Sequence, residues 1–330
     1  MTLLLPGCAT VSETALQRFE FTQPQMGVPF RIVLYTTNEV HAKAAADEAF
    51  ARVRQLNDRL SDYDLDSELS RLSRASGQGL ATRVSEDLWR VLKEAQYWAE
   101  RSGGAFDVTV GPFVNLWRRA RRIQRLPEPE KLAEARARVG YTNITLDAKN
   151  RTVLLKVPEM RLDLGGIAKG YAADEALKTL CRDGIRRALV AAAGDIALGD
   201  PPPGERGWKV EIGSLDVTNA PPALFLRLAN RGVATSGDVF QRLEIDGVRY
   251  SHIVDPRTGL GLTDHSLVTV LARDCMTADA LATTVSVLGP EAGLRLIKNT
   301  PGPAVRILRQ PGDRIEVIEH PPSAFNAAEK

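Results

Sequence analysis

MRLDLGGIAKGYAADEALKTLCR, residues Met160 to Arg182, joins a strand pattern to a helix pattern through a glycine-rich turn. The alternation of apolar and charged residues over 160–164 predicts a strand, and the spacing of apolar residues over 168–182 predicts a helix. Glycines at such a junction let the backbone approach a ligand, and the N–H groups at a helix start favour an anion. The turn is neither a Walker A loop nor a GxGxxG loop, and tight strand–helix packing is the alternative explanation.

Strand and helix patterns surround this segment without a regular strand–helix alternation, which predicts an α+β fold (mixed α/β). Residues 10–25 are expected to form a tether, and an Ala-rich amphipathic helix is expected over 39–60. Ser67 is predicted to cap a short helix, and another helix is predicted over 85–101. A hairpin is predicted over 143–157. Further strands are expected at 27–35, 188–192, 208–212, 223–228, 248–254, 267–272, 305–308 and 314–318, and further helices at 276–288 and 291–298.

The composition is that of a soluble globular protein of enzyme size, with 330 residues, of which 44% are hydrophobic and 25% charged. The formal net charge of +2 does not indicate nucleic-acid binding. The arginine-rich segment over 118–125 is expected to be a solvated helix face. Cys8, Cys181 and Cys275 stand far apart, so zinc ribbons and iron–sulfur ligation are excluded. No two histidines lie at ligand spacing, so a bound metal should be a hard cation on oxygen ligands.

The first residues, MTLLLPGCAT, contain a string similar to the end of a bacterial lipoprotein signal, in which the cysteine, here Cys8, becomes lipidated. The apolar run is too short for a secretory signal, and an accidental match is the alternative. We therefore divide the chain into a lipobox-like N-terminus with its tether, over 1–20, and a folded domain over 21–330.

SHIVDPRTG, over 251–259, puts an imidazole, a carboxylate and a guanidinium within six positions, at His252, Asp255 and Arg257. Pro256 restricts the backbone around it, so the three groups are expected on a rigid loop. Such a set suits a phosphorylated or acidic ligand. A corner in which Asp255 and Arg257 only pair with each other is the alternative.

Two further segments combine carboxylates with other groups. In SGGAFD, over 102–107, Phe106 either covers a ring or lies in the core, and Asp107 either caps a helix or contacts a ligand. In TADALATT, over 277–284, Asp279 and Thr283 are four residues apart and share one helix face. These two oxygen groups are expected to form part of a Mg²⁺ shell, and the alternative is that Asp279, near a helix start, is only a dipole partner.

Together, these segments resemble the ApbE family of FAD:protein FMN transferases, from about residue 26 to about residue 296. Each matching string is modest alone, but eight of them in the family's order are specific. They are MG at 26, SDYDLDSELSRL at 61, GGAFDVTVGPFVNLW at 103, LDLGGIAKGYAAD at 162, AGDI at 193, ATSGD at 234, SHIVDPRTG at 251 and ADALATT at 278. The resemblance implies an ApbE-like fold with mixed sheets flanked by helices, and a flavin transferase catalytic domain over 21–330.

The resemblance also implies a reaction and its residues. Family members bind FAD as substrate with a divalent cation, usually Mg²⁺ and here also conceivable as Mn²⁺, release AMP, and join FMN through its phosphate to a threonine hydroxyl of a target protein. The family's metal positions fall on Gly166 (through its carbonyl), Asp279 and Thr283. Its flavin-nucleotide positions fall on Met26, Tyr63, Ala105, Phe106, Asp107, Asp163, Lys169, His252 and Ile253. His252 and Asp279 are the catalytic candidates, and His252 or Asp255 is expected to accept the hydroxyl proton.

The sequence departs from the family's GGD triplet at one position, because Ala193 precedes Gly194 and Asp195. A Cβ at Ala193 would strain the turn if the φ angle there is positive. Two other functions fit the same residues. One is a Mg²⁺-dependent FAD pyrophosphatase that yields FMN and AMP, and the other is a non-catalytic FAD-binding lipoprotein.

The expected partners are FAD and an acceptor protein with a target threonine, such as a redox-pump subunit or another exported flavoprotein, and no nucleic acid. The expected location is periplasmic or extracytoplasmic, as an inner-membrane lipoprotein. Membrane contact would then be limited to a lipid on Cys8.

Overall fold

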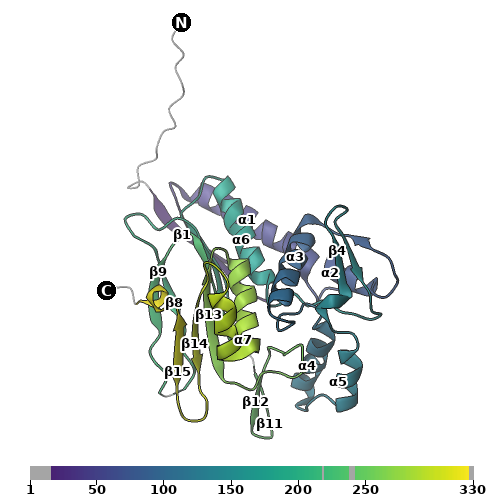
Figure 1. The fold of residues 1–330 in the computed structure, drawn as a ribbon. Coiled ribbons are helices and arrows are strands. Elements are labelled where there is room, and N and C mark those ends of the chain that lie inside the picture. The colour runs from purple at the N-terminus through teal and green to yellow at the C-terminus, as the bar shows by residue number, and fades with distance from the viewer. Residues whose placement is uncertain (1–15, 218, 238–241, 327–330) are drawn as a thin grey trace.

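An antiparallel sheet of eight strands runs through the computed structural model, which describes residues 16–217, 219–237 and 242–326 (Figure 1). Every neighbouring pair in this sheet is antiparallel. In spatial order the strands are β1 (Gln17–Gln25), β2 (Val28–Thr36), β6 (Ala188–Ala192), β7 (Asp195–Leu198), β10 (Arg231–Gly237), β13 (Ser266–Ala272), β14 (Ala304–Arg309) and β15 (Glu316–His320).

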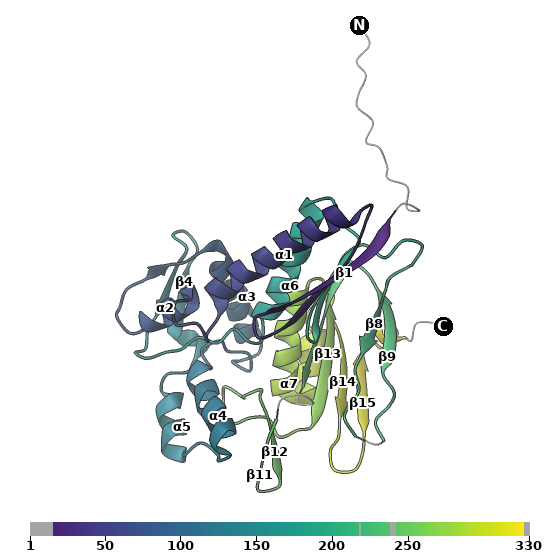
Figure 2. The same cartoon turned by 180° about the vertical axis from the view of Figure 1, so that it is seen from behind.

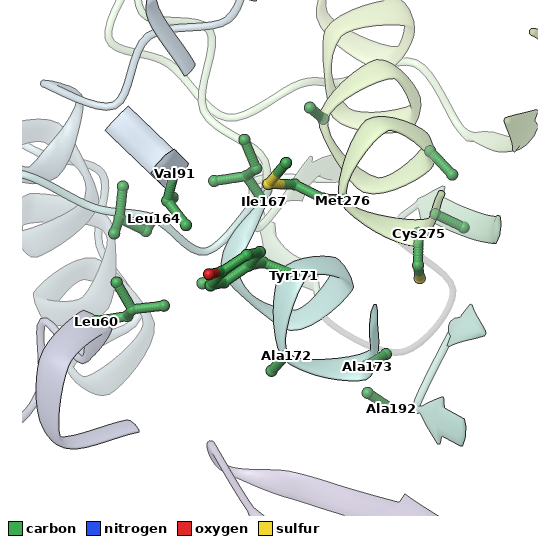
Figure 3. Packing of buried hydrophobic residues seen from close by; sticks show 14 of the residues in the cluster. Leu60, Val91, Leu164, Ile167, Tyr171, Ala172, Ala173, Ala192, Cys275 and Met276 are labelled. Atoms are coloured by element: carbon green, nitrogen blue, oxygen red, sulfur yellow. The ribbon is translucent and has the colours of Figure 1, made fainter. Parts of the chain in front are cut away.

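Three long helices cover one face of this sheet, namely α1 (Glu39–Leu60), α6 (Ala168–Arg182) and α7 (Cys275–Lys298) (Figures 1 and 2). Small residues line their contacts: Ala42, Ala46 and Ala49 of α1 are buried, as are Ala172 and Ala176 of α6. Such side chains let helix backbones approach closely. Tyr171 of α6 fills the space between α1 and α7, beside Leu60, Ile167 and Met276 (Figure 3).

A two-stranded ribbon covers the other face of the sheet. It consists of β8 (Trp208–Ile212) and β9 (Leu224–Leu228), which pair antiparallel. In β8, buried and exposed residues alternate, so Trp208, Val210 and Ile212 all point inward. They pack with Val33, Leu189 and Leu271 of the large sheet, which is therefore buried on both faces.

Smaller elements extend the molecule beside the helical face. One group comprises α2 (Glu68–Arg74), α3 (Glu86–Arg101) and a three-stranded sheet of β3 (Thr82–Arg83), β5 (Thr152–Leu155) and β4 (Ile144–Asp147). A second group comprises α4 (Gly111–Ile123), α5 (Pro129–Arg136) and the hairpin β11 (Arg242–Ile245)–β12 (Val248–Ser251), which share a core around Phe113 and Trp117. Short 3₁₀ turns lie at Tyr141–Asn143 and Pro322–Phe325.

Most predicted elements are confirmed, and so is the α+β class. The helices at 39–60 and 168–182 have the predicted bounds. Ser67 caps α2 by accepting a hydrogen bond from the Ser70 N–H, and the hairpin over 143–157 forms as β4 and β5. The predicted helices at 276–288 and 291–298 are the two halves of α7, which break at Gly289 with a φ of 73° before Pro290.

Two predictions are wrong. The tether was expected to reach residue 25, but β1 spans 17–25 and pairs along its length with β2, so the boundary drawn after residue 20 falls inside a strand. The segment over 160–164 is not a strand, because only Arg161 forms a bridge, to Val110. The backbone there is held instead by Ser73 Oγ, which accepts from the Leu162 N–H, and by Val108 O, which accepts from the Asp163 N–H.

Among the described residues, none of the helices is long and apolar enough to cross a membrane. Cys8 and the lipobox-like string lie outside the described residues.

Candidate active site

Several predicted site residues lie on or against one face of α7. Asp279, Thr283 and Val287 follow one another at four-residue intervals, so their side chains line the same side of the helix, which we call the α7 strip. Asp274 caps the helix start by accepting from the Thr277 N–H at 2.8 Å. Asp174 of α6 accepts from the N–H groups of Cys275 and Met276 at 2.9 Å, which fixes the strip relative to α6.

Asp279 is buried where α6 and α7 are in close contact. Its Oδ2 atom accepts from the Gly170 N–H at 3.0 Å and lies 3.7 Å from the Lys169 ammonium. Burial raises the pKa of Asp279 to about 7, and the nearby Asp195 adds to the rise. The helix start is already capped by Asp274, so Asp279 is not needed as a dipole partner.

Lys169 connects Asp279 to Asp195, a residue that the predicted site set did not include. The Lys169 ammonium lies 2.7 Å from Asp195 Oδ2. Burial alone would lower the pKa of Lys169, but the charges of Asp195 and Asp279 outweigh it and raise that pKa. Asp195 follows the β6–β7 turn, in which Ala193 has a φ of 56°, so the expected strain at this position is confirmed.

Gly166 and Thr283 face each other across the start of α6. A Cβ added at Gly166 would lie 2.9 Å from Thr283 Oγ1, so only glycine fits there without a shift. Ser236 Oγ of β10 lies 3.4 Å from the same hydroxyl. The structure thus brings Gly166, Thr283 and Asp279 together, as the resemblance implied.

These groups suit a hard divalent cation. The donors are a carbonyl, a carboxylate and a hydroxyl, which are the oxygen ligands that Mg²⁺ and Mn²⁺ take. The described residues contain no cluster of three or more His, Cys, Asp or Glu that could hold a metal. A site built on Asp279 therefore depends on backbone and hydroxyl oxygens, with substrate or water completing the shell.

The SHIVDPRTG loop contacts the far end of the α7 strip. Ile253 packs with Val287 and with Ala105 of the SGGAFD segment in one small cluster. Arg257 donates to the Val287 carbonyl at 3.1 Å and to both oxygens of Asp255 at 2.9 Å. The pairing expected as the alternative for Asp255 and Arg257 is therefore present, and it anchors the loop to α7.

His252 occupies a different position on this loop. It follows the last residue of β12 and is exposed, whereas its neighbours Ser251 and Ile253 are buried. Its imidazole can therefore meet a reactant from solution, while Asp255 is engaged by Arg257.

A second set of predicted residues is joined by Arg118 of α4. Its guanidinium donates to Asp163 at 3.2 Å and to Asp62 at 2.5 Å, and it lies 4.0 Å above the ring centre of Tyr63. Burial and the neighbouring Asp62 raise the pKa of Asp163 to about 6. Asp163 Oδ1 also accepts from the Gly165 N–H at 2.8 Å, which shapes the glycine turn before α6. Tyr63 is 75% exposed, so its ring is open to a ligand.

The contacts of Phe106 and Asp107 are those of structural residues. Phe106 is buried in the main core. Asp107 accepts from the N–H and hydroxyl of Thr109 and from the Tyr141 N–H, at 2.7 to 2.8 Å. Burial raises the pKa of Asp107 despite these bonds. Its oxygens shape the loop between α3 and α4, which carries Ala105 to the α7 strip.

Met26 lies in the turn between β1 and β2, with a φ of 49°. β2 pairs with β6 so that Phe30 faces Ala192, which puts this turn at the same end of the sheet as Ala193 and Asp195. The Met26 side chain packs against the main core. The MG and AGDI strings thus lie at the same end of the sheet. Asp238 of ATSGD lies outside the described residues.

A separate cavity of about 310 Å³ lies between α3 and the start of α7, lined by Glu94, Trp98 and Thr277 among others. Thr277 is two residues from Asp279, so the two side chains project from roughly opposite sides of the helix. The cavity contains none of the predicted site residues.

Comparison with known proteins agrees with this geometry. A model of the ApbE family matches residues 26–307. The chain belongs to the ApbE family. A FAD:protein FMN transferase of Vibrio cholerae is 34% identical over 312 residues, which cover 93% of this chain and 91% of the relative. A FAD:protein FMN transferase of Haemophilus influenzae is 36% identical over 256 residues, covering 76% and 74%.

The fold agrees as well. The solved structure of flavin transferase ApbE from Vibrio cholerae superposes with a TM-score of 0.83 at 32% sequence identity, covering 92% of this chain and 97% of that one. The ApbE-like α+β fold with sheets flanked by helices is thereby confirmed, although the paired strands of the described residues are antiparallel and the predicted mixed sheets are not found. The chain is an enzyme of the transferase class.

Proposed function

We propose that this protein transfers FMN from FAD to a threonine hydroxyl of an acceptor protein and releases AMP. The observation on which this depends is the α7 strip, where Asp279, Thr283 and the Gly166 backbone converge beside Lys169. The ApbE relatives, which are FAD:protein FMN transferases, support the same reaction.

The proposed step breaks the phosphoanhydride bond of FAD and forms a phosphoester bond to the acceptor. The acceptor hydroxyl oxygen bonds to the FMN-side phosphorus of FAD, the bond to the bridging oxygen breaks, and AMP leaves with that oxygen. The hydroxyl proton goes to a base on the protein. Such a transfer depends mainly on positioning and charge neutralisation.

Asp279, Thr283 and the Gly166 carbonyl would hold Mg²⁺ or Mn²⁺. When bound, the cation would neutralise charge on the diphosphate and on the departing phosphate. The hard oxygen donors support this assignment. Asp279 must be deprotonated to bind a cation, and a pKa of about 7 makes that proton easy to displace near neutral pH.

His252 is the better candidate for the base. The residue is exposed at the edge of the site, and histidine is the side chain that most often acts as a general base. Asp255 is buried and held by Arg257, which supports a role in fixing the loop. Tyr63, with the Arg118 guanidinium on one side of its exposed ring, is the group we expect to contact the flavin nucleotide from solvent.

Incubation of the purified protein with FAD, Mg²⁺ and an acceptor domain tests the reaction. We expect the acceptor to gain one FMN by mass spectrometry, to fluoresce in a denaturing gel, and to do neither when Asp279→Asn replaces the unaltered enzyme. Free FMN and AMP without a labelled acceptor would identify a pyrophosphatase instead. Intact FAD after hours with Mg²⁺ would identify a flavin-binding protein.

We further propose that the protein acts outside the cytoplasm, attached to the inner membrane by a lipid on Cys8, and that its acceptor is an exported flavoprotein such as a redox-pump subunit. Support comes from the lipobox-like string at the N-terminus.

A further inference from the structure

Lys169 lies between two buried carboxylates and is much closer to one of them. Its ammonium is 2.7 Å from Asp195 Oδ2 but 3.7 Å from Asp279 Oδ2. The side chains of Asp195 and Asp279 are only 5% and 3% exposed, so water screens these charges weakly. The uneven distances mean that the closer ion pair of Lys169 is with Asp195, and the pair with Asp279 is longer.

The position of the Lys169 ammonium determines how accessible Asp279 is to a cation. Its Oδ2 atom already accepts from the Gly170 N–H at 3.0 Å. A shift of the Lys169 ammonium by about 1 Å toward Asp279 would make a direct ion pair there, and the flexible lysine stem permits such a shift. An ammonium in that place would compete with a metal ion for the carboxylate.

The sheet holds Asp195 firmly. Asp195 pairs with Ala192 across the β6–β7 turn and with Ala234 of β10. Gly194 O accepts from the Thr235 N–H at 3.1 Å, which ties the turn to β10. A carboxylate on such a rigid support can retain a lysine in one place.

We propose that Asp195 is a positioning residue: by pairing with Lys169 it keeps the ammonium away from Asp279 and leaves that carboxylate open to a divalent cation. This inference rests on the cation site of the proposed function. The competing explanation is that Asp195 only stabilises the β6–β7 turn.

Three variants of the full chain distinguish the two explanations: Asp195→Asn, Lys169→Met and the double variant. The measurement is Mn²⁺ binding to flavin-free protein, followed by the electron paramagnetic resonance signal of free Mn²⁺. We expect Asp195→Asn to weaken binding by at least about tenfold, because an unpaired ammonium then faces the cation. Lys169→Met should bind Mn²⁺ at least as tightly as the unaltered protein.

The double variant is the decisive one. Removing both charges restores the original charge balance, so Mn²⁺ affinity should return to within about threefold of the unaltered value. Loss of a purely structural contact would not be rescued in this way. Asp200→Asn is the matched control, because Asp200 pairs with Arg186 at 2.9 Å beyond the other end of β7, and it should leave Mn²⁺ binding unchanged.

Several outcomes would overturn the inference. Equal Mn²⁺ binding by Asp195→Asn and the unaltered protein would do so, and so would weak binding that persists in the double variant. Weaker binding by Lys169→Met would also contradict it, even if Asp195→Asn failed to fold. If the unaltered protein bound no Mn²⁺, the proposed cation site would fail and the inference with it.

Discussion

Ala193 has a backbone conformation that L-residues other than glycine rarely adopt. Its φ of 56° puts the Cβ close to the following carbonyl. The next residue, Gly194, has no room for a side chain, because a Cβ there would lie 2.9 Å from the Thr235 carbonyl oxygen. The turn that precedes Asp195, the partner of Lys169, is therefore strained at Ala193.

Ala193→Gly should relieve this strain. The left-handed conformation costs alanine about 1–2 kcal/mol, whereas the added freedom of glycine in the unfolded chain costs about 0.5–1 kcal/mol. We expect the free energy of unfolding, measured with urea, to rise by about 0.5 kcal/mol. Ala191→Gly within β6 is the control and should lower it by a similar amount. A loss of stability in Ala193→Gly would refute the strain.

At the scale of single residues, the sequence predicted which side chains share a helix face better than it predicted which distant side chains pair with each other. The i, i+4 spacing of Asp279 and Thr283 was sufficient to predict their shared helix face, because helix geometry is local. Asp195 was not predicted, since its pairing with Lys169 depends on how β7 lies beside α6. The AGDI string contained the residue, but one sequence gives no distance between separate strings.

The contact between α6 and α7 depends on glycine. A Cβ at Gly170 would lie 2.4 Å from the Cys275 carbonyl oxygen and 2.9 Å from the Asp279 Cβ. Both distances are below contact, so a larger residue must push the helices apart. The α7 strip would then move relative to Lys169 and Gly166.

Gly170→Ala should therefore reduce both stability and FMN transfer. Overpacking of a buried contact costs typically about 1–3 kcal/mol, and a displacement of catalytic groups by about 1 Å lowers activity by as much as about a hundredfold. Gly213→Ala is the control, because its Cβ would meet Leu267 Cδ2 at an ordinary 3.6 Å. Thermal unfolding and acceptor labelling measure the two effects, and unchanged labelling by Gly170→Ala would contradict the close-contact explanation.

Asp87 of α3 links three helices. It accepts from Arg52 and Arg59 of α1 and, at 2.7 Å, from the Tyr171 hydroxyl of α6. Burial alone would raise the pKa of Asp87, but the hydrogen bonds from Arg52, Tyr171 and Arg59 outweigh burial and lower it to about 2.

Stability should consequently fall in acid. The pKa of Asp87 is lower in the folded chain than its ordinary value of 3.8, so its contribution is complete above pH about 4 and is lost as the pH falls toward 2. Asp87→Asn should cost about 3 kcal/mol near neutral pH, because Arg59 loses its carboxylate partner and Arg52 keeps only Glu175. Urea unfolding from pH 6 to 2 should show this difference shrinking below pH about 4. A difference that is constant with pH would show that the pKa of Asp87 is not lowered.

Among the elements, helices with strong periodicity were predictable and short pieces of the sheet were not. The predicted bounds of α1 and α6 match because the buried stripes of both helices and the Asn38 cap of α1 are local signals. β7 and β10 were not predicted, since β7 has only four residues and β10 contains Gly232 and Gly237. The false strand at 160–164 shows the converse, because apolar residues that alternate with polar ones can be buried without pairing in a ladder.

At the scale of the whole molecule, segments up to about 250 residues apart meet at one end of the large sheet. The β1–β2 turn, the glycine turn before α6, the β6–β7 turn and the α7 strip all reach this end. Antiparallel pairing of strands that are distant in sequence creates this convergence. Single-sequence reasoning could not predict that strand order, and the resemblance to a family implied only the general fold.

Cys8→Ser tests the proposed anchor separately from the chemistry. We expect the variant to lose incorporation of a labelled lipid precursor and to leave the membrane fraction, because the attachment atom is gone. FMN transfer to a soluble acceptor should be unchanged, since the residues of the α7 strip are not altered. Continued lipid labelling of the Cys8→Ser variant would contradict the anchor.

The central claim is that oxygens of Asp279, Thr283 and Gly166 hold a divalent cation against the diphosphate of FAD. Anomalous X-ray scattering from a crystal grown with Mn²⁺ and FAD tests it most directly. We predict one Mn²⁺ peak in bonding contact with the Asp279 carboxylate, the Thr283 hydroxyl and the Gly166 carbonyl, and touching the diphosphate. A Mn²⁺ peak elsewhere, or a diphosphate bound far from the α7 strip, would contradict the claim.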